Sequence, residues 1–244
     1  MAKKKSESSI DFKAIEEMFE KIITQYNDAI DAKGTTKQCY PNRKKSTKQE
    51  TRPKHTEYLQ LKISLNGTKP QVWRRVIVDP SLSLEDMNEV IWLVMPWMGH
   101  HMHMFSNDTI RASVPYEDDF FNNDTDDYEE LCIGDFFTKV GDKCKYEYDF
   151  SDGWEHTILL EKFIEPLEET RAKFITGRNL APPDDCGGIY GYERLKMILE
   201  NPAHPEYNRM RDWLQIEEDV IFDPKYLGFT AKNIAEINEE LEGM

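Results

Sequence analysis

Three histidines have a spacing that could ligate a metal ion. If the segment around His101 and His103 is a β-strand, both imidazoles project from one face, two residues apart along the strand. His156 lies beyond a later turn, where Asp149 or Asp152 could add a carboxylate. The pattern predicts a divalent-metal site at His101, His103 and His156 if the sheet brings the two segments together. The alternative is a set of hydrogen-bonded histidines covered by aromatic side chains, since an HxH pair alone is common.

Two consecutive arginines follow a tryptophan in a second segment of strand-like sequence. Alternation along this strand sends Arg74 to the face of the neighbouring valines, whereas Arg75 shares the face of Trp73. A buried guanidinium needs a carboxylate or several carbonyls, because an unpaired internal charge is very costly. One interpretation is therefore a structural cation in the core, and the other is recognition of phosphate or carboxylate by the guanidinium fork.

Two loops carry further candidate residues. The Asp152-Gly153 pair before Trp154 is typical of a tight turn, and its carboxylates next to a histidine could also serve acid–base chemistry. The loop PPDDCGG contains Cys186, and the amides of its glycines, at a helix start, could hold an anion. This loop lacks the lysine and the Ser/Thr of a phosphate-binding loop, and the neighbouring aspartates disfavour a reactive thiolate.

Composition limits the classes of protein to which the chain can belong. The 244 residues are 39% hydrophobic and 11% aromatic, enough for one sizeable core, and the net charge of -15 excludes a globally basic nucleic-acid-binding surface. The sequence shows neither an apolar stretch long enough to span a membrane nor an apolar signal region after its start. The four cysteines form no CxxC pair, so we expect reduced thiols and a cytoplasmic protein without membrane association.

The charge divides the chain into a basic arm and an acidic body. Residues 1–55 hold 13 Lys and Arg against 8 Asp and Glu, whereas residues 56–244 hold 18 against 38. Helical spacing of apolar residues predicts a separate helix over residues 11–32, and the polar, Pro-interrupted segment 34–55 indicates a linker. We therefore expect two units, 1–55 and 56–244, and the arm is a candidate contact for nucleic acid.

The body has the pattern of an α+β fold with a largely antiparallel sheet and helices packed on it. Period-2 alternation and turn signals predict strands over residues 58–65, 71–79, 101–105, 143–150, 154–163 and 171–176. Helical periodicity predicts helices over residues 84–95, 190–200, 205–215 and 231–242. Strands come first and helices gather late, which favours α+β over a regular βαβ series.

Four motifs in order give the body a resemblance to a known family. They are YLQLKISLNGTKPQVWRRVIV, LEDMNEVIWLVMPWMGHHMHMF, GDKCKYEYDFSDGWEHTILLE and APPDDCGGIYGYERL, which together cover about residues 58–213. The chain thus resembles the plasmid pRiA4b ORF-3-like proteins, also described as insertion-element passenger proteins. The resemblance implies an association with mobile elements but no activity that can be transferred. The residues that it places at motif positions include Trp73, Arg74, Arg75, His101, His103, Asp149, Asp152, Trp154, His156, Asp185 and Cys186.

Two functions remain open at this point. The first is a non-enzymatic binding or adaptor domain for an unidentified protein or small molecule, with a groove lined by Trp73, Arg75, Trp154, His101 and His156. The second is a metal-dependent hydrolase that uses the predicted His/Asp site. Both require the two strand hairpins to present these side chains to a common hollow.

Overall fold

The computed structural model describes residues 57–114, 125–168, 170–214 and 231–242. The strands are β1 (Tyr58–Leu65), β2 (Trp73–Val78), β3 (His103–Ser106), β4 (Arg111–Ser113), β5 (Lys143–Tyr148), β6 (Trp154–Ile164) and β7 (Ala172–Arg178). The helices are α2 (Leu84–Val94), α3 (Gly188–Leu199), α4 (Tyr207–Trp213) and α5 (Ala231–Glu242), with a 3-10 helix at Ile133–Phe136. Within these residues, no helix combines the length and the apolar character needed to cross a membrane.

The seven strands form one antiparallel sheet in the order β4-β3-β5-β6-β1-β2-β7. The β1–β2 connection turns at Gly67, whose φ of 82° favours glycine, and the β5–β6 connection turns at Gly153 with a φ of 67°. This confirms the predicted α+β class and the two predicted hairpins.

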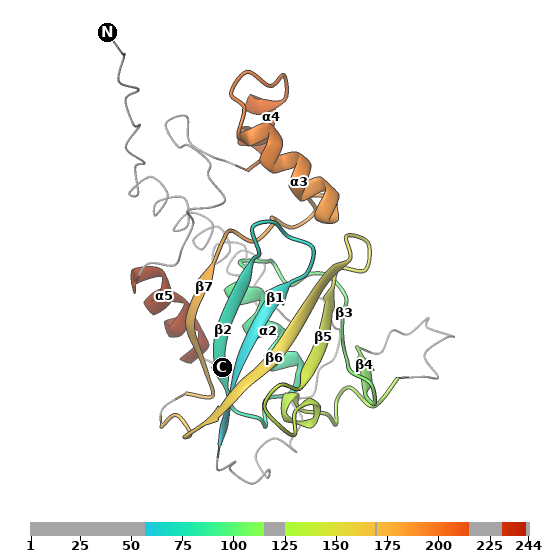
Figure 1. The fold of residues 1–244 in the computed structure, drawn as a ribbon, viewed down its shortest axis with the longest axis vertical. Helices are drawn as coiled ribbons and strands as arrows, with labels where there is room; N and C mark the ends of the chain where they lie inside the picture. Colours follow the sequence, from blue (N-terminus) through green and yellow to red (C-terminus); the bar gives the residue numbers. More distant parts are fainter. Residues whose placement is uncertain (1–56, 115–124, 169, 215–230, 243–244) are drawn as a thin grey trace.

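One face of the sheet is covered by α2, and α5 lies beside β7 (Figure 1). Helix α2 buries an apolar stripe that includes Met87, Val90 and Ile91, and the Ser83 side chain caps it by accepting the Asp86 N–H at 3.0 Å. Helices α3 and α4 extend beyond one end of the sheet (Figure 1). The other face of the sheet carries mainly half-buried and exposed side chains, many of them polar or charged, so most of the described core lies on the α2 side.

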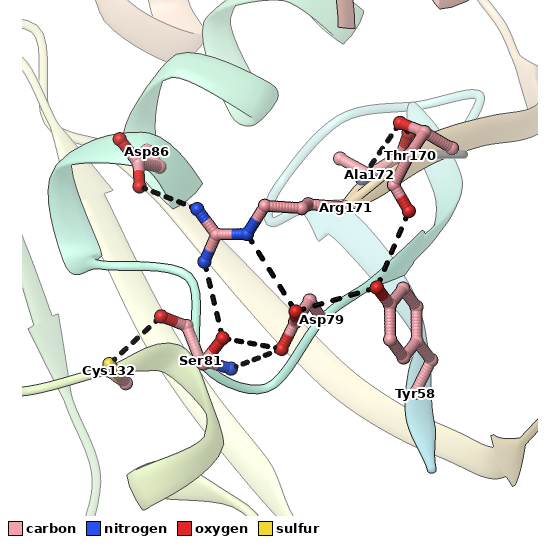
Figure 2. Close-up of polar contacts among 8 residues, drawn as sticks. All are labelled: Tyr58, Asp79, Ser81, Asp86, Cys132, Thr170, Arg171 and Ala172. Atoms are coloured by element: carbon pink, nitrogen blue, oxygen red, sulfur yellow. Dashed lines mark hydrogen bonds and ion pairs between the residues drawn. The ribbon is translucent and has the colours of Figure 1, made fainter. Parts of the chain in front are cut away.

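A polar network joins the start of α2 to the ends of three strands (Figure 2). Arg171, just before β7, lies 3.7 Å from carboxylate oxygens of both Asp79 and Asp86 and donates to Ser81 Oγ at 3.2 Å. Asp79 also accepts from the hydroxyl of Tyr58 on β1 at 3.5 Å. The network ties these strand ends together at the end of the sheet opposite the β5–β6 turn (Figure 1).

Three features differ from the sequence-based expectations or lie beyond their reach. The predicted helix 11–32 and the linker to residue 55 lie outside the described residues, so a boundary near residue 56 stays a prediction. Strand β4 and the 3-10 helix were not predicted, because three or four residues carry too little periodicity. Strand β3 begins at His103 instead of His101, since Gly99, with a φ of 66°, and a bend at His101 precede it.

Candidate functional site

Three segments meet at the end of the sheet where β5 turns into β6. They are the bend before β3, the β5–β6 turn and the loop before α3, and they carry His101, Asp149 and Asp185 respectively. Backbone groups hold the segments together, because the Asp149 N–H donates to the Met102 carbonyl at 2.9 Å. The Gly187 N–H donates to an Asp152 carboxylate oxygen at 3.0 Å and fixes the third segment to the turn.

Asp149 is held rigidly in its turn. Its backbone has a φ of 53°, in the left-handed region that aspartate tolerates better than most residues. Its Oδ1 accepts hydrogen bonds from the Ser151 N–H, the Ser151 hydroxyl and the Asp152 N–H. Burial alone would raise the pKa of this carboxyl, but these hydrogen bonds and the nearby His101 outweigh it and lower the pKa. Asp149 is therefore a buried carboxylate whose Oδ2 is turned toward His101.

The imidazole of His101 lies between two carboxylates. Its Nδ1 is 3.7 Å from Asp149 Oδ2, and its Nε2 is 3.5 Å from Asp185 Oδ1. One nitrogen of His101 and one oxygen from each aspartate all lie within 4.8 Å of one another. The Asp185 side chain is 76% exposed, so the site opens to solvent on that side. Within the described ranges, this is the group of histidine, cysteine and carboxylate side chains with the proximity required for one cation.

A third aspartate adds negative charge to the same place. Asp184 Oδ2 accepts the Met98 N–H at 2.7 Å, while its Oδ1 is buried without a hydrogen-bond partner in the described chain. Burial, assisted by the charges of Asp185 and Asp149, raises the pKa of Asp184 to about 6 against the opposing effects of the Met98 N–H and His101. The site is thus rich in carboxylates that repel one another.

Aromatic rings form the inner wall of the site. Tyr148 packs edge-on against His101 with ring centroids 5.5 Å apart, and its other neighbour, Trp97, stacks on it at 4.8 Å with an interplanar angle of 9°. Burial, and secondarily the carboxylate of Asp184, raise the pKa of the Tyr148 hydroxyl well above its usual range. Tyr148 therefore stays protonated and forms a fixed, apolar support for His101.

The structure places the other two predicted metal ligands inside the core. His103 is fully buried, and its Nε2 lies 2.6 Å from the Tyr128 hydroxyl. His156 is also fully buried; its ring nitrogens have no well-aligned partner among the described residues, although the Tyr146 and Trp154 backbones lie near. Burial lowers the pKa of each imidazole to about 3. Of the three predicted histidines, the described geometry therefore brings His101 alone to a group of potential ligands.

The residues expected to share a groove lie on different sides of the sheet. Trp154 and His156 are buried on the α2 face, whereas Trp73 and Arg75 lie half-buried on the opposite face. Arg75 forms a bidentate ion pair with Glu161 at 2.6 and 2.8 Å. These four side chains therefore do not line one hollow with His101.

Arg74 has the structural role that the sequence left open. It is fully buried, and its guanidinium donates to the carbonyls of Val94, Trp73, Arg178 and Asn179 at 2.6 to 3.1 Å. Burial lowers the pKa of Arg74 to about 9, so the side chain remains cationic at neutral pH. Its partners include the last residue of α2, a position where helix carbonyls favour a positive charge.

Cys186 and Asp152 support the site instead of lying at its centre. Burial, followed by the charges of Asp152 and Asp184, raises the pKa of the Cys186 thiol to about 12, which disfavours a thiolate nucleophile. The Asp152 carboxylate is occupied by the Gly187 N–H. The predictions of site residues missed Asp184, and Asp185 was recognised only through its motif. Their sequence signal was the paired aspartates of the PPDDCGG loop, which also fits a simple turn.

Comparison with known proteins gives relatives without an assigned activity. The chain is 29% identical over 156 residues to the uncharacterized protein y4hQ of Sinorhizobium fredii (strain NBRC 101917 / NGR234), a match covering 64% of this chain and 79% of the relative. It is similar to the crystal structure of a protein of unknown function, MM3350 from Methanosarcina mazei Go1, with a TM-score of 0.60 and 29% identity over 73% of this chain and 97% of the other. Residues 57–230 match the family described as plasmid pRiA4b ORF-3-like protein. The chain therefore belongs to the plasmid pRiA4b ORF-3-like family, as its four motifs predicted.

Proposed function

We propose that this protein binds one divalent cation through His101, Asp149 and Asp185 and acts as a metal-dependent hydrolase. The observation that carries the proposal is the convergence of an imidazole and two carboxylates, from three separate segments, within 4.8 Å. This set differs from the three-histidine prediction, because His103 and His156 point into the core.

The donor set fits a small divalent ion. Ligand atoms about 2.1 Å from a tetrahedral ion lie roughly 3.4 Å apart. The one ligand atom that each of His101, Asp149 and Asp185 offers lies within 4.8 Å of the other two, so a bound ion would draw the three atoms somewhat closer together. Oxygen-rich sites with one imidazole suit Mn²⁺ and Zn²⁺. The hydrogen bonds on Asp149 Oδ1 orient the carboxylate and leave Oδ2 toward His101, a supporting role typical of residues around metal ligands.

The arrangement also has the openness that hydrolysis requires. Three protein ligands leave coordination positions for water and substrate, and the exposed Asp185 marks the solvent side. A bound cation would supply Lewis acidity at this point. Tyr148 and Trp97 exclude solvent from behind His101.

Titration with Mn²⁺ tests the proposal directly. We expect the wild-type protein, purified without an imidazole column, to bind one Mn²⁺ per chain by calorimetry and electron paramagnetic resonance. Asp149→Asn should weaken this binding at least about tenfold, since it removes a ligand charge but keeps the turn's acceptor. Asp142→Asn is the matched control, because Asp142 accepts from the Thr138 N–H, the Thr138 hydroxyl and the Lys139 N–H through one oxygen and lies outside the site.

The result also separates a cation site from a simple ion pair. If His101 only pairs with its carboxylate neighbours, neither Mn²⁺ nor Zn²⁺ would bind stoichiometrically. Equal affinity in the Asp149→Asn and Asp142→Asn variants would likewise refute the assignment. If Mn²⁺ binds, hydrolysis of p-nitrophenyl phosphate and p-nitrophenyl acetate that depends on Mn²⁺ and on Asp149 would support the enzyme.

A binding or adaptor domain is the second candidate function. It is supported by large apolar side chains exposed on or directly beside the segments that build the site. Met98 is 42% exposed, Phe150 49% and Tyr190 91%, which is typical of recognition surfaces. Metal binding without hydrolysis would favour this function, with a protein or small molecule as partner, and the association with mobile elements stays a prediction for either.

A further inference from the structure

The face of the sheet opposite α2 carries an ordered array of cations in a strongly acidic protein. In an antiparallel sheet, residues paired across neighbouring strands point to the same face. Following those pairs from strand to strand therefore shows which side chains form continuous rows on this surface. Two neighbouring rows contain six cations and no carboxylate, although the whole chain has a net charge of -15.

The first row crosses all seven strands. From β7 to β6 it consists of Arg178, Trp73, Ser64 and Thr157. From β5 to β4 it continues through Lys145, Ser106 and Arg111. A cation therefore lies on each edge strand and a third lies between them, with hydroxyl side chains and one indole in the intervening positions. With neighbouring strands about 4.8 Å apart, this row is about 29 Å long.

The second row lies beside the first, two residues along each strand. It runs from β7 to β5 through Thr176, Arg75, Lys62, Leu159 and Lys143. We call the six cations of the two rows the basic track: Lys62, Arg75, Arg111, Lys143, Lys145 and Arg178. Three of them, Arg111, Lys143 and Arg178, are exposed, and the other three are half-buried.

The flanking carboxylates neutralise only part of this charge. Glu161 pairs with Arg75 at 2.6 Å, and Glu155 and Glu147 lie 2.6 and 3.3 Å from Lys145. Lys143 and Arg178 form no ion pair with any residue in the described part of the chain. The track therefore keeps an excess of positive charge at both ends, where a linear anion would enter and leave.

An aromatic ring lies within the track. The Lys62 ammonium lies 5.2 Å and the Arg75 guanidinium 5.1 Å from the Trp73 ring centroid. Half-buried aromatic side chains on an open sheet, with cations around them, are the arrangement on which unpaired bases stack while phosphates contact Lys and Arg. Serine and threonine hydroxyls, which recur in both rows, are common donors to phosphate oxygens.

We propose that the basic track binds single-stranded nucleic acid, with the phosphodiester chain crossing the strands from β7 to β4. The rows place cations on β1, β2, β4, β5 and β7, which matches an extended polyanion that crosses the sheet, and Trp73 is partly exposed between them. An acidic protein segment would match the charge but would make no use of the aromatic ring within the track. This surface is on the sheet and differs both from the candidate cation site and from the basic arm.

Fluorescence anisotropy with a labelled 20-nucleotide oligo(dT) tests this assignment on the full chain. We expect Lys143→Glu/Arg178→Glu to weaken binding at least about tenfold in 100 mM salt. Each lost phosphate contact flattens the plot of log affinity against log salt by about 0.7, so the slope should fall by about 1.4 or more. Trp73→Ala should lower the affinity while the salt slope stays unchanged, because it removes stacking and no charge.

The matched control is Lys139→Glu/Arg209→Glu, which makes the same change in net charge at two exposed residues outside the two rows and keeps the basic arm. Arg111→Glu/Lys143→Glu gives an independent test at the other edge, and thermal melts verify that each variant folds. If the track variants and the control weaken wild-type binding equally, the proposal is overturned, because the arm or the net charge would then explain the binding. Tighter binding of a 20-residue poly-glutamate, or of duplex DNA, would overturn it in favour of an acidic protein or a double strand, and no binding at about 100 µM would end it.

Discussion

Acid unfolding of this protein should depend on a histidine in its core. The folded state holds His156 fully buried between Trp97 and Tyr146, with ring centroids 5.3 Å from each, and burial lowers its pKa to about 3. In the unfolded chain the same imidazole titrates near pH 6.5. The unfolded state thus binds one more proton between these two values, so the contribution of His156 is present above pH 6.5 and is lost as the pH falls toward 3.

The size of the effect follows from the difference between the two pKa values. Each pH unit below 6.5 costs about 1.4 kcal/mol of unfolding free energy, which amounts to about 2 kcal/mol at pH 5. His156→Phe removes the titrating group and keeps a ring of similar shape. We expect the free energy difference between His156→Phe and wild type to move by about 2 kcal/mol in favour of the variant between pH 8 and pH 5. Overpacking by the larger ring contributes equally at both pH values and does not affect this change.

Urea unfolding followed by tryptophan fluorescence at pH 8 and pH 5 measures this change in the free energy difference between His156→Phe and wild type. Phe174→Leu is the matched control, since it also alters a fully buried ring but changes no titrating group. A difference between His156→Phe and wild type that is the same at pH 8 and pH 5 would refute the reasoning. It would mean that His156 is protonated in the folded state or reaches solvent.

Two further predictions concern buried charges. The folded protein raises the pKa of Asp184 to about 6 from an ordinary 3.8, so its carboxylate destabilises the fold above pH 6. Asp184→Asn should therefore stabilise the metal-free protein by up to about 3 kcal/mol at pH 8 and by nothing at pH 3.5. A urea series over pH checks this, and a pH-independent difference would contradict it. Arg74→Lys should destabilise the fold by about 3 kcal/mol, because a compact ammonium cannot reach the carbonyls of Val94 and Asn179 at the same time. Urea unfolding also measures this effect. A loss of unfolding free energy below about 1 kcal/mol would show that the forked geometry of the guanidinium is dispensable.

The sequence was sufficient for the elements whose periodicity is local. Leu59, Leu61 and Ile63 alternate with polar residues and are buried in β1, and the α2 stripe follows helical spacing from a capping serine. These features depend on residues a few positions apart, so no tertiary information is needed to predict them. The order of the strands in the sheet cannot be predicted in this way, because it depends on contacts between distant segments. Strand β1, for example, lies between β2 and β6, which are far apart in the chain.

The candidate site was harder to predict because it depends on where a strand begins. The HxH pattern places both imidazoles on one face only if the strand includes His101, and β3 starts two residues later. His103 then points into the core, whereas His101 lies in the bend and faces Asp149. The positive φ of Gly99 helps to bend the chain before β3, and the positive φ of Asp149 shapes the turn that faces this bend. His101 and His103 therefore have different surroundings, although their spacing in the sequence suggests the same role for both.

Arg74 and Arg75 illustrate the same limit at single-residue resolution. They are identical neighbours, yet alternation in β2 buries Arg74 beneath the end of α2 and presents Arg75 to the basic track. The sequence shows that the two must face opposite ways, but not which face is covered, because the covering helix is specified by other residues. The fold therefore encloses one guanidinium in carbonyl groups and leaves the other partly exposed beside Glu161. This is why a double-row pattern of cations becomes visible only after the strand pairing is known.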